Sequence, residues 1–447
     1  MFSGCATYYQ QNAKLNALVQ KGDFVKAREV LVAQGDSVSG KNRVLHQMNR
    51  GWIDHMLGNY QQSIAMLNKA DLYIEDYQKN YASEAVAMLS NPGVKPYAPE
   101  DPEKVMVNYY KALDFLQLGD YQSALVEARR INQKLAELND KYKGKKNRYA
   151  NDAFAHVLMG LIYDASYDYN NAFIAYRNAL TAYDSVYSQQ FGIGAPAQLK
   201  ADILRTAWLN GFNEELAFYE EKFQTKYQHT PNEGGTLVYF WENGFGPVKD
   251  EWSINFSKVG SDGGMAMIEN AEYGMSFPVF LGNSKSSGGF ADLNFLRVAF
   301  PKYIERQTVY KQATLKTAVG DVAFEKAQDL NAILFKTLED RMVREMANSI
   351  ARLAAKKAME AAVREGDKNI GAVVGIVNAV SEKADTRNWQ TLPSQISYAK
   401  VQLPVGEQTV ELVFDGQTLI PIPVSIQKGK TAFKSFRSLE SRLPQGR

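Results

Sequence analysis

The sequence predicts an α+β protein, with an N-terminal solenoid of paired helices followed by a β-sheet or sandwich domain that contains an inserted long helical segment. Three observations carry this prediction. A short turn phrase recurs through the first half of the chain. Residues that favour strands, separated by turn signals, follow position 231. Residues 323–365 contain few helix breakers and many good helix formers.

The chain has 447 residues, and two or three domains are expected at this length. The three patterns predict where the boundaries between its segments lie. The predicted boundaries are 1–7 for an N-terminal linker, 8–230 for the helical array, 231–320 for a β-rich region, 321–388 for the inserted helices and 389–447 for strands that complete the β-region.

The array is predicted from a phrase of glycine, Asp or Asn, and an aromatic residue. Glycine ends one helix because it enters the left-handed region without a steric cost, and Asp or Asn caps the next helix. A small residue three positions after the aromatic lets the two helices approach closely. Versions of the phrase are Gly22-Asp23-Phe24, Gly58-Asn59-Tyr60, Gly119-Asp120-Tyr121 and Tyr167-Asp168-Tyr169, and a fifth turn is expected at Gly211.

At its turns the array resembles the tetratricopeptide repeat. Gly22 and Gly58 lie 36 residues apart, close to the repeat of about 34 residues, and the later intervals are longer. An ordinary helical bundle with Gly-Asp turns is the alternative. The sequence does not decide whether three further segments have a function or are simply packed or solvated. These segments are the proline-rich loop at 91–102, the basic run at 141–149 and the small-residue segment at 371–375.

The β-region is predicted from runs of β-branched and aromatic residues with turn signals between them. Helical signal is expected to return near Val322. The expected strands lie at 236–242, 252–256, 275–281, 296–300 and 306–310 before the inserted helices, and at 398–403, 408–414 and 419–427 after them.

Composition narrows the function classes. The chain has 51 basic and 49 acidic residues and a net charge of +2, a balance that argues against a nucleic-acid binder, which shows a basic stripe or patch. Its single cysteine, Cys5, allows no disulfide within the chain. No apolar run approaches the roughly 18 residues of a membrane span.

The N-terminus predicts a lipid anchor. Phe2-Ser3-Gly4-Cys5 resembles the lipobox of bacterial lipoproteins, in which the cysteine is lipidated and becomes the mature N-terminus. The resemblance implies a periplasmic protein held by acyl chains, and the absence of Asp after Cys5 favours the outer membrane. The alternative is a cytosolic protein with a buried thiol near its start. Whether Met1 is a native start is open.

A second resemblance involves the C-terminal third. Ala384-Asp385-Thr386-Arg387-Asn388-Trp389-Gln390-Thr391-Leu392-Pro393, together with the lipobox and the repeats, resembles a family of poorly characterised bacterial envelope lipoproteins with tetratricopeptide-type repeats. The resemblance implies a role in envelope or cell-wall assembly and carries over no catalytic residue. The segment 403–410 is similar to small β-modules of the PEGA type. Locally, we expect Asp385 and Arg387 to pair while Trp389 buries the joint, with a partner hot spot as the alternative.

No catalytic, metal-binding or cofactor-binding pattern is found in the sequence. None of the four histidines, His46, His55, His156 and His229, has a metal-ligand spacing. The sequence does not exclude a pair of carboxylates that cleaves glycans, but no spacing identifies such a pair.

The sequence therefore predicts a non-catalytic scaffold, without cofactor, that uses the concave side of the array to bind envelope proteins. The alternatives are a self-associating subunit of a large envelope ring or secretion machine, and a cell-wall glycan-binding or glycan-cleaving protein. The candidate partner-binding residues are Tyr109, Tyr121, Tyr169, Tyr176, Arg387 and Trp389.

Overall fold

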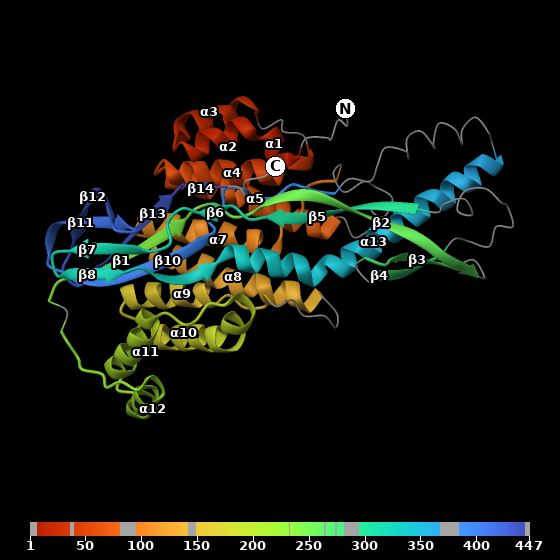
Figure 1. Ribbon diagram of the computed structural model, residues 1–447. Helices are drawn as coiled ribbons and strands as arrows, with labels where there is room; N and C mark the ends of the chain where they lie inside the picture. The colour runs from red at the N-terminus through yellow and green to blue at the C-terminus, as the bar shows by residue number, and fades with distance from the viewer. Residues whose placement is uncertain are drawn as a thin grey trace.

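Figure 1 shows the computed structural model, which describes residues 7–35, 40–80, 95–141, 149–231, 233–262, 265–272, 275–280, 295–366 and 384–442. Paired helices stack into an array, a β-sandwich lies along one side of this array, and one long helix with a further sheet extends away from both. The predicted fold class is thereby confirmed. The residue boundaries of the domains stay a prediction.

The array consists of helical hairpins that follow one another along the chain. After the short α1 (Tyr8–Gln11), the pairs are α2 (Ala13–Gln20) with α3 (Phe24–Ala33), α4 (Arg43–Met56) with α5 (Tyr60–Asn80), α7 (Asp101–Gln117) with α8 (Tyr121–Lys141), α9 (Ala153–Ala165) with α10 (Tyr169–Ala182), and α11 (Ala197–Leu209) with α12 (Asn213–Phe223). A short 3₁₀ helix, η1 (Gly40–Asn42), precedes α4, and a π-helix, η3 (Tyr183–Phe191), extends α10.

The turns within these pairs have the predicted chemistry. The Asp120 carboxylate accepts a hydrogen bond from the Ser123 N–H at 3.0 Å, and Asp168 accepts one from the Asn171 N–H at 3.1 Å. These side chains satisfy N–H groups that the first helical turn leaves free. Four turn glycines adopt φ angles of 68° to 75°, a region that favours glycine: Gly22, Gly58, Gly119 and Gly211.

The central sheet is assembled from segments far apart in the sequence. Its strand order is β13-β1-β10-β9. β1 (Gly235–Asn243) pairs antiparallel with β10 (Gln395–Leu403) and parallel with β13 (Thr431–Ser438), and β10 pairs antiparallel with β9 (Glu325–Asp329).

Both faces of the central sheet are buried. On one face, Val238 and Phe240 pack against the helical array, and on the other Leu237, Tyr239 and Trp241 pack against a second sheet. This second sheet has the order β12-β11-β7-β8, formed by β12 (Gln417–Ile426), β11 (Gly406–Phe414), β7 (Ala313–Thr317) and β8 (Gly320–Ala323). The run of apolar residues along β1 reflects burial on both sides.

Side chains of the array cap the two edges of the central sheet. On the β13 edge, the Gln117 amide donates to the Phe433 carbonyl at 3.0 Å and the Tyr121 hydroxyl donates to the Thr431 carbonyl at 2.9 Å. On the β9 edge, the Tyr183 hydroxyl donates to a backbone carbonyl at 2.7 Å. An uncapped edge is a template for pairing with another chain, so the array protects the sheet as well as supporting it.

The third part is an arm that extends away from the array (Figure 1). The helix α13 (Leu330–Gly366) packs along a sheet of order β4-β3-β2-β5. The strands are β2 (Val248–Asp262), β3 (Met265–Asn270), β4 (Met275–Phe280) and β5 (Phe295–Ile304), and a small two-stranded sheet joins β6 (Gln307–Thr308) to β14 (Ser441–Arg442) near its base.

Two details of the predicted elements are wrong. The strand expected at 306–310 is reduced to the two residues of β6. The helix expected from about Val322 begins at Leu330, because β8 and β9 occupy the residues before it. Val322 lies in a hairpin that pairs β8 with β7, and tertiary pairing of this kind overrides local helix propensity.

Several predictions concern residues outside the described ranges, including Cys5, the start of the loop at 91–94, most of the basic run at 141–149 and the segment 371–375. In the described part, the predicted helix start at Asp101 is confirmed. None of the described helices is both long enough and apolar enough to cross a membrane.

Candidate functional site

The array-facing side of the central sheet becomes polar at one end. Val238 of β1 and Tyr398 of β10 are buried against the array. The next residues on the same face of these strands are Thr236, Lys400 and Gln402, because side chains alternate along a strand. A cavity of about 520 Å³ opens here between the sheet and the end of the array. Both halves of the molecule therefore contribute to this site.

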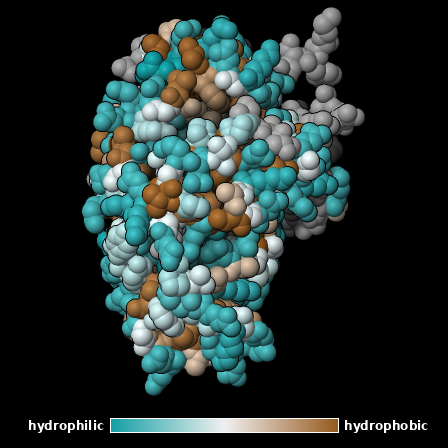
Figure 2. Space-filling model, turned by 90° about the vertical axis from the view of Figure 1, so that its left-hand side faces the viewer, coloured by the Kyte–Doolittle hydropathy of each residue, from teal (hydrophilic) through white to brown (hydrophobic). Residues whose placement is uncertain are grey.

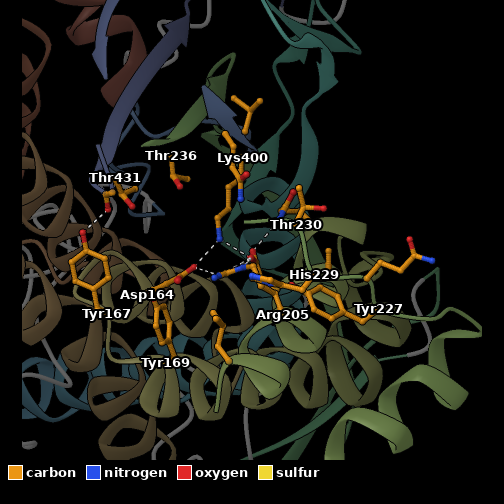
Figure 3. A pocket seen from close by; sticks show the side chains of 18 residues that line it. Asp164, Tyr167, Tyr169, Arg205, Tyr227, His229, Thr230, Thr236, Lys400 and Thr431 are labelled. Atoms are coloured by element: carbon orange, nitrogen blue, oxygen red, sulfur yellow. Dashed lines mark hydrogen bonds and ion pairs between the residues drawn. The ribbon is translucent and has the colours of Figure 1, made fainter. Parts of the chain in front are cut away.

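An ion network crosses the cavity (Figure 3). Lys400 extends from the sheet toward the array, and its Nζ lies 2.8 Å from Asp164 Oδ2 and 2.6 Å from Asp202 Oδ1. Arg205 Nη2 lies 3.1 Å from Asp202 Oδ1 and also contacts Asp164. Asp164 ends α9, and the other two array residues lie on α11. Two cations and two carboxylates thus form one closed group.

The network stays charged despite its burial. Burial raises the pKa of Asp164, but Lys400 and Arg205 outweigh this effect and leave that pKa below its ordinary value. For Arg205, burial lowers the pKa, while Asp202 and Asp164 raise it to a value above the ordinary one. Both groups are therefore ionised at neutral pH.

A strained tyrosine forms one flank of the cavity. Tyr167 occupies the turn position that other pairs fill with glycine, and its φ is 60°. Residues with a Cβ rarely adopt this conformation. The Tyr167 hydroxyl donates to the Gly429 carbonyl at 2.5 Å, and its ring meets the Tyr169 ring edge-on at 6.4 Å. Strain of this kind is often held at functional positions.

The opposite flank comes from the linker after α12. Its rings, Tyr227 and His229, lie on the other side of the ion network from Tyr167 and Tyr169 (Figure 3). The His229 ring stacks on Trp208 with centroids 3.8 Å apart, and its Nδ1 lies 3.2 Å from the Tyr227 hydroxyl. Figure 2 shows the end of the molecule that is on the left in Figure 1, where hydrophobic residues form separate groups within a mostly polar surface.

The sequence-predicted partner residues are mostly occupied inside the molecule. Tyr109, Tyr176, Arg387 and Trp389 are buried, with at most 6% of each residue exposed. The half-buried residues are Tyr121, which caps the sheet edge, and Tyr169, which lines the cavity. Partner contact through these six residues stays a prediction, and for the four buried ones it requires that surrounding segments first move away.

The expected joint at 385–389 has the local structure that the sequence indicates. Arg387 Nε donates to Asp385 Oδ1 at 2.8 Å, and the Arg387 guanidinium also donates to the carbonyls of Lys41 and Lys95. Trp389 is 1% exposed. The segment thereby ties the loop before α7 to the N-terminal helices, which is a packing role.

One face of the array is covered by the chain's own central sheet. Apolar contact from β1, β10 and β13 fills it, and the sheet edges are capped from the same array. This face is therefore filled by the chain itself, and partner binding through the concave side of the array stays a prediction. The physical reason for the filling is the pairing of β1 with strands more than 150 residues away, which no local pattern reveals.

Buried titratable groups elsewhere have structural partners. Glu100 contacts Lys249 and Arg341, and His55 Nδ1 lies 2.6 Å from Asp114 Oδ1. These carboxylates are at most 4% exposed, and neither of them lines the cavity beside Lys400. Among the residues that the structure describes, no group of His, Cys, Asp and Glu side chains is arranged to hold a metal ion.

Sequence reasoning missed the four charged residues of the cavity. Two signals were present. Lys400 and Gln402 are polar at positions that continue the buried face of a strand, and Tyr167 replaces glycine at a turn. The partners Asp164, Asp202 and Arg205 lie on helices in which charged residues are ordinary.

No protein-family model matches the chain, and no curated protein matches it. Solved structures with similarity to about half of the chain include MamA residues 41 to the end from Desulfovibrio magneticus RS-1, with 14% identity, coverage of 48% of this chain and 90% of that chain, and a TM-score of 0.30. The apo form of RapI has 12% identity, coverage of 48% and 52%, and a TM-score of 0.34.

A third similar structure contains nearly identical TPR-like repeats of a putative kinesin light chain from Podosopora anserina. It has 14% identity, coverage of 48% of this chain and 91% of that chain, and a TM-score of 0.31. At these TM-scores the similarities carry no argument about function, which has to come from the site itself.

Proposed function

We propose that this chain is a non-catalytic scaffold that binds a protein partner as a lipid-anchored subunit of a bacterial cell-envelope assembly. One observation supports it most directly. The array's sheet-facing side is filled by the chain's own sandwich, whereas the arm extends beyond the body and presents an uncovered row of side chains. The partner therefore binds the arm, and the array serves as its support.

The row lies on the outer side of α13. A helix of 37 residues is about 55 Å long. Leu338, Met346 and Ile350 are buried on its inner side. On the outer side, Phe335 is 38% exposed and Val343 is 63% exposed. Residues four apart lie on one side of a helix, so these two form part of one exposed stripe that a partner can cover.

The lipid anchor is part of the same proposal. Cys5 lies outside the described residues, and α1 begins at Tyr8, close behind it. A lipid at Cys5 would hold the array next to a membrane, and the absence of Asp after the cysteine favours the outer membrane. The arm would then be free to reach a periplasmic partner, such as a component that controls wall synthesis.

Cross-linked co-purification tests the arm. Full-length protein is cross-linked in its own envelope, purified and analysed by mass spectrometry. We expect Val343→Glu to lose the specific partners because it places a charge at the most exposed apolar position of the row. Val126→Glu, on the exposed side of α8 and 47% exposed in the native chain, is the matched control and retains them. Equal partner recovery from both variants would show that the arm is not the binding element.

Separate measurements test the anchor and the ring alternative. If Cys5→Ser leaves the protein in the membrane fraction, the anchor is wrong. Sedimentation of the purified protein at high concentration distinguishes a partner-binding arm from self-association. Assemblies that Val343→Glu dissolves would favour a subunit of a large envelope ring, in which a second copy covers the same row.

A further inference from the structure

We propose that the cavity between the array and the central sheet is a binding site for a neutral saccharide. The site is defined by the ion network of Lys400, Asp164, Asp202 and Arg205 and by the aromatic flanks on either side of it (Figure 3). It is separate from the arm, so it adds a second binding activity to the proposed scaffold.

The cavity is built from polar residues at a place where apolar packing would be expected. The array-facing side of the sheet is buried and apolar in its middle, at Val238, Phe240, Ile396 and Tyr398, and at this end it switches to Thr236, Lys400 and Gln402. Sealing this end with aliphatic side chains would bury more apolar surface and remove the desolvation cost of Lys400. The polar end therefore has a use other than packing.

The charge of the cavity selects a neutral ligand. Lys400 and Arg205 are each engaged by both carboxylates, so the four formal charges cancel. An anion would meet Asp164 and Asp202, and a cation would meet the two bases. Either ion would have to break a mostly buried network, which is costly. A neutral molecule can use the remaining lone pairs and N–H groups without breaking it.

The available groups match the chemistry of sugar hydroxyls. A hydroxyl both donates and accepts, so it suits a site that mixes carboxylates with guanidinium, ammonium and amide groups. Sugar rings also have apolar C–H faces that pack on aromatic rings, and such rings stand on both flanks, from Tyr169 to Tyr227. The volume of about 520 Å³ lies within the range of small-molecule pockets.

A peptide fits the lining less well. Peptide and protein partners bind most strongly through apolar or aromatic anchors that fill dry pockets. Only three of the residues that line this cavity are aliphatic: Ala201, Leu209 and Val401. Because a peptide backbone is also neutral and polar, a short peptide belongs in the test.

Calorimetry with defined oligosaccharides tests the proposal. The full chain is titrated with chitotriose, cellotriose and maltotriose, with trialanine as the peptide probe, and circular dichroism verifies the fold of each variant. We expect at least one trisaccharide to bind in the millimolar range or tighter. Gln402 is exposed at the cavity, so Gln402→Ala should leave the fold intact and weaken binding about fivefold to tenfold through a lost hydrogen bond.

Two matched controls make the result specific. Gln61→Ala removes an exposed glutamine from α5, away from the cavity, and should leave affinity unchanged. Tyr227→Ala should weaken binding about tenfold, whereas Phe218→Ala, an exposed aromatic on α12 outside the lining, should not. No heat with any trisaccharide at 10 mM, unchanged affinity in both cavity variants, or binding of trialanine alone would each overturn the proposal.

Discussion

The Lys400 ammonium, on a strand of the central sheet, lies 2.8 Å from the Asp164 carboxylate at the end of helix α9. The two residues are 236 positions apart. This ion pair, with Asp202 and Arg205, joins the helical array to the β-sandwich across a cavity. A ligand that enters the cavity contacts the groups that hold its two walls together. Ligand binding and the stability of the protein are therefore linked.

Removing the lysine should destabilise the fold. Lys400→Met leaves Asp164 and Asp202 with Arg205 as their only cation in this group, and both carboxylates are largely buried. We expect the free energy of unfolding to fall by about 3 kcal/mol, measured by urea denaturation. Lys428→Met, at an exposed position, is the matched control and should change it by less than about 0.5 kcal/mol. Equal effects would show that the network contributes little.

Variants of Tyr167 should separate the backbone strain at this turn from the contribution of its hydrogen bond to stability. Tyr167→Gly removes the cost of a side chain at φ 60° and loses the hydrogen bond to Gly429. These effects are each about 1 kcal/mol and opposite in sign, so stability should change little. Tyr167→Ala keeps the strain, loses the bond and should cost about 1 kcal/mol or more. Thermal and urea unfolding of both variants give the comparison. An Ala variant as stable as the Gly variant would contradict it.

Close packing of α9 on α10 depends on Gly160. A Cβ at this position would overlap the ring of Tyr176, which is fully buried. Gly160→Ala should therefore lower the free energy of unfolding by about 1–3 kcal/mol, because the ring has to shift within a filled core. At Gly194 the added Cβ meets nothing within 4 Å, so Gly194→Ala is the control with little change. Denaturant midpoints at constant slope measure the difference.

Acid should weaken the base of the arm through Glu100. Burial raises the pKa of Glu100, but Arg341 and Lys249 outweigh it and lower that pKa to about 2, from 4.5. A lowered folded-state pKa gives stability that is present above pH 4.5 and is lost as the pH falls toward 2. The loss is about 3 kcal/mol. Urea unfolding at pH 5 and pH 2.5 measures the larger part of this loss, about 2 kcal/mol, because a carboxyl with a pKa of about 2 is still mostly ionised at pH 2.5.

A variant isolates this contribution. Burial, the largest cause, raises the pKa of Glu103 in the same cluster, so proton uptake there favours the folded state as the pH falls and acts in the opposite direction. Glu100→Gln is less stable at pH 5, because two cations lose their partner, but it keeps Glu103. Its stability should therefore fall less between pH 5 and pH 2.5 than that of the native chain. If the variant and the native chain lose the same stability between these two pH values, Glu100 is not the cause of the acid sensitivity.

The sequence predicted those parts of the fold that depend on local chemistry. The Gly-Asp turns were found because backbone conformation and capping leave a signal within six residues, as at Gly119 and Asp120. The pair of Asp385 with Arg387 was found for the same reason. Strand existence after position 231 followed from composition, whereas the hairpin at Val322 was misread because its support comes from distant strands.

The candidate site was not predictable in the same way. Lys400 is two residues from the buried Tyr398, and only the pairing of β10 with β1 places both over the array. The partner residues sit on helices α9 and α11, whose distance from the strand in sequence is large. Tyr109 and Trp389 are candidates for partner binding because aromatic residues suit binding surfaces as well as cores. The structure buries both residues, with at most 2% of each exposed, and partner contact through them stays a prediction.

The strand order of the central sheet has a consequence for the nascent chain. β1 lies about halfway along the chain, but its partners β10 and β13 are near the C-terminal end. Until the ribosome has added them, the apolar side of the array and both sides of β1 have no covering. Long-range pairing of this kind forms slowly and leaves adhesive intermediates. The nascent chain is therefore accessible to proteases until these strands are added. A chain that lacks its last strands would need a chaperone to remain soluble.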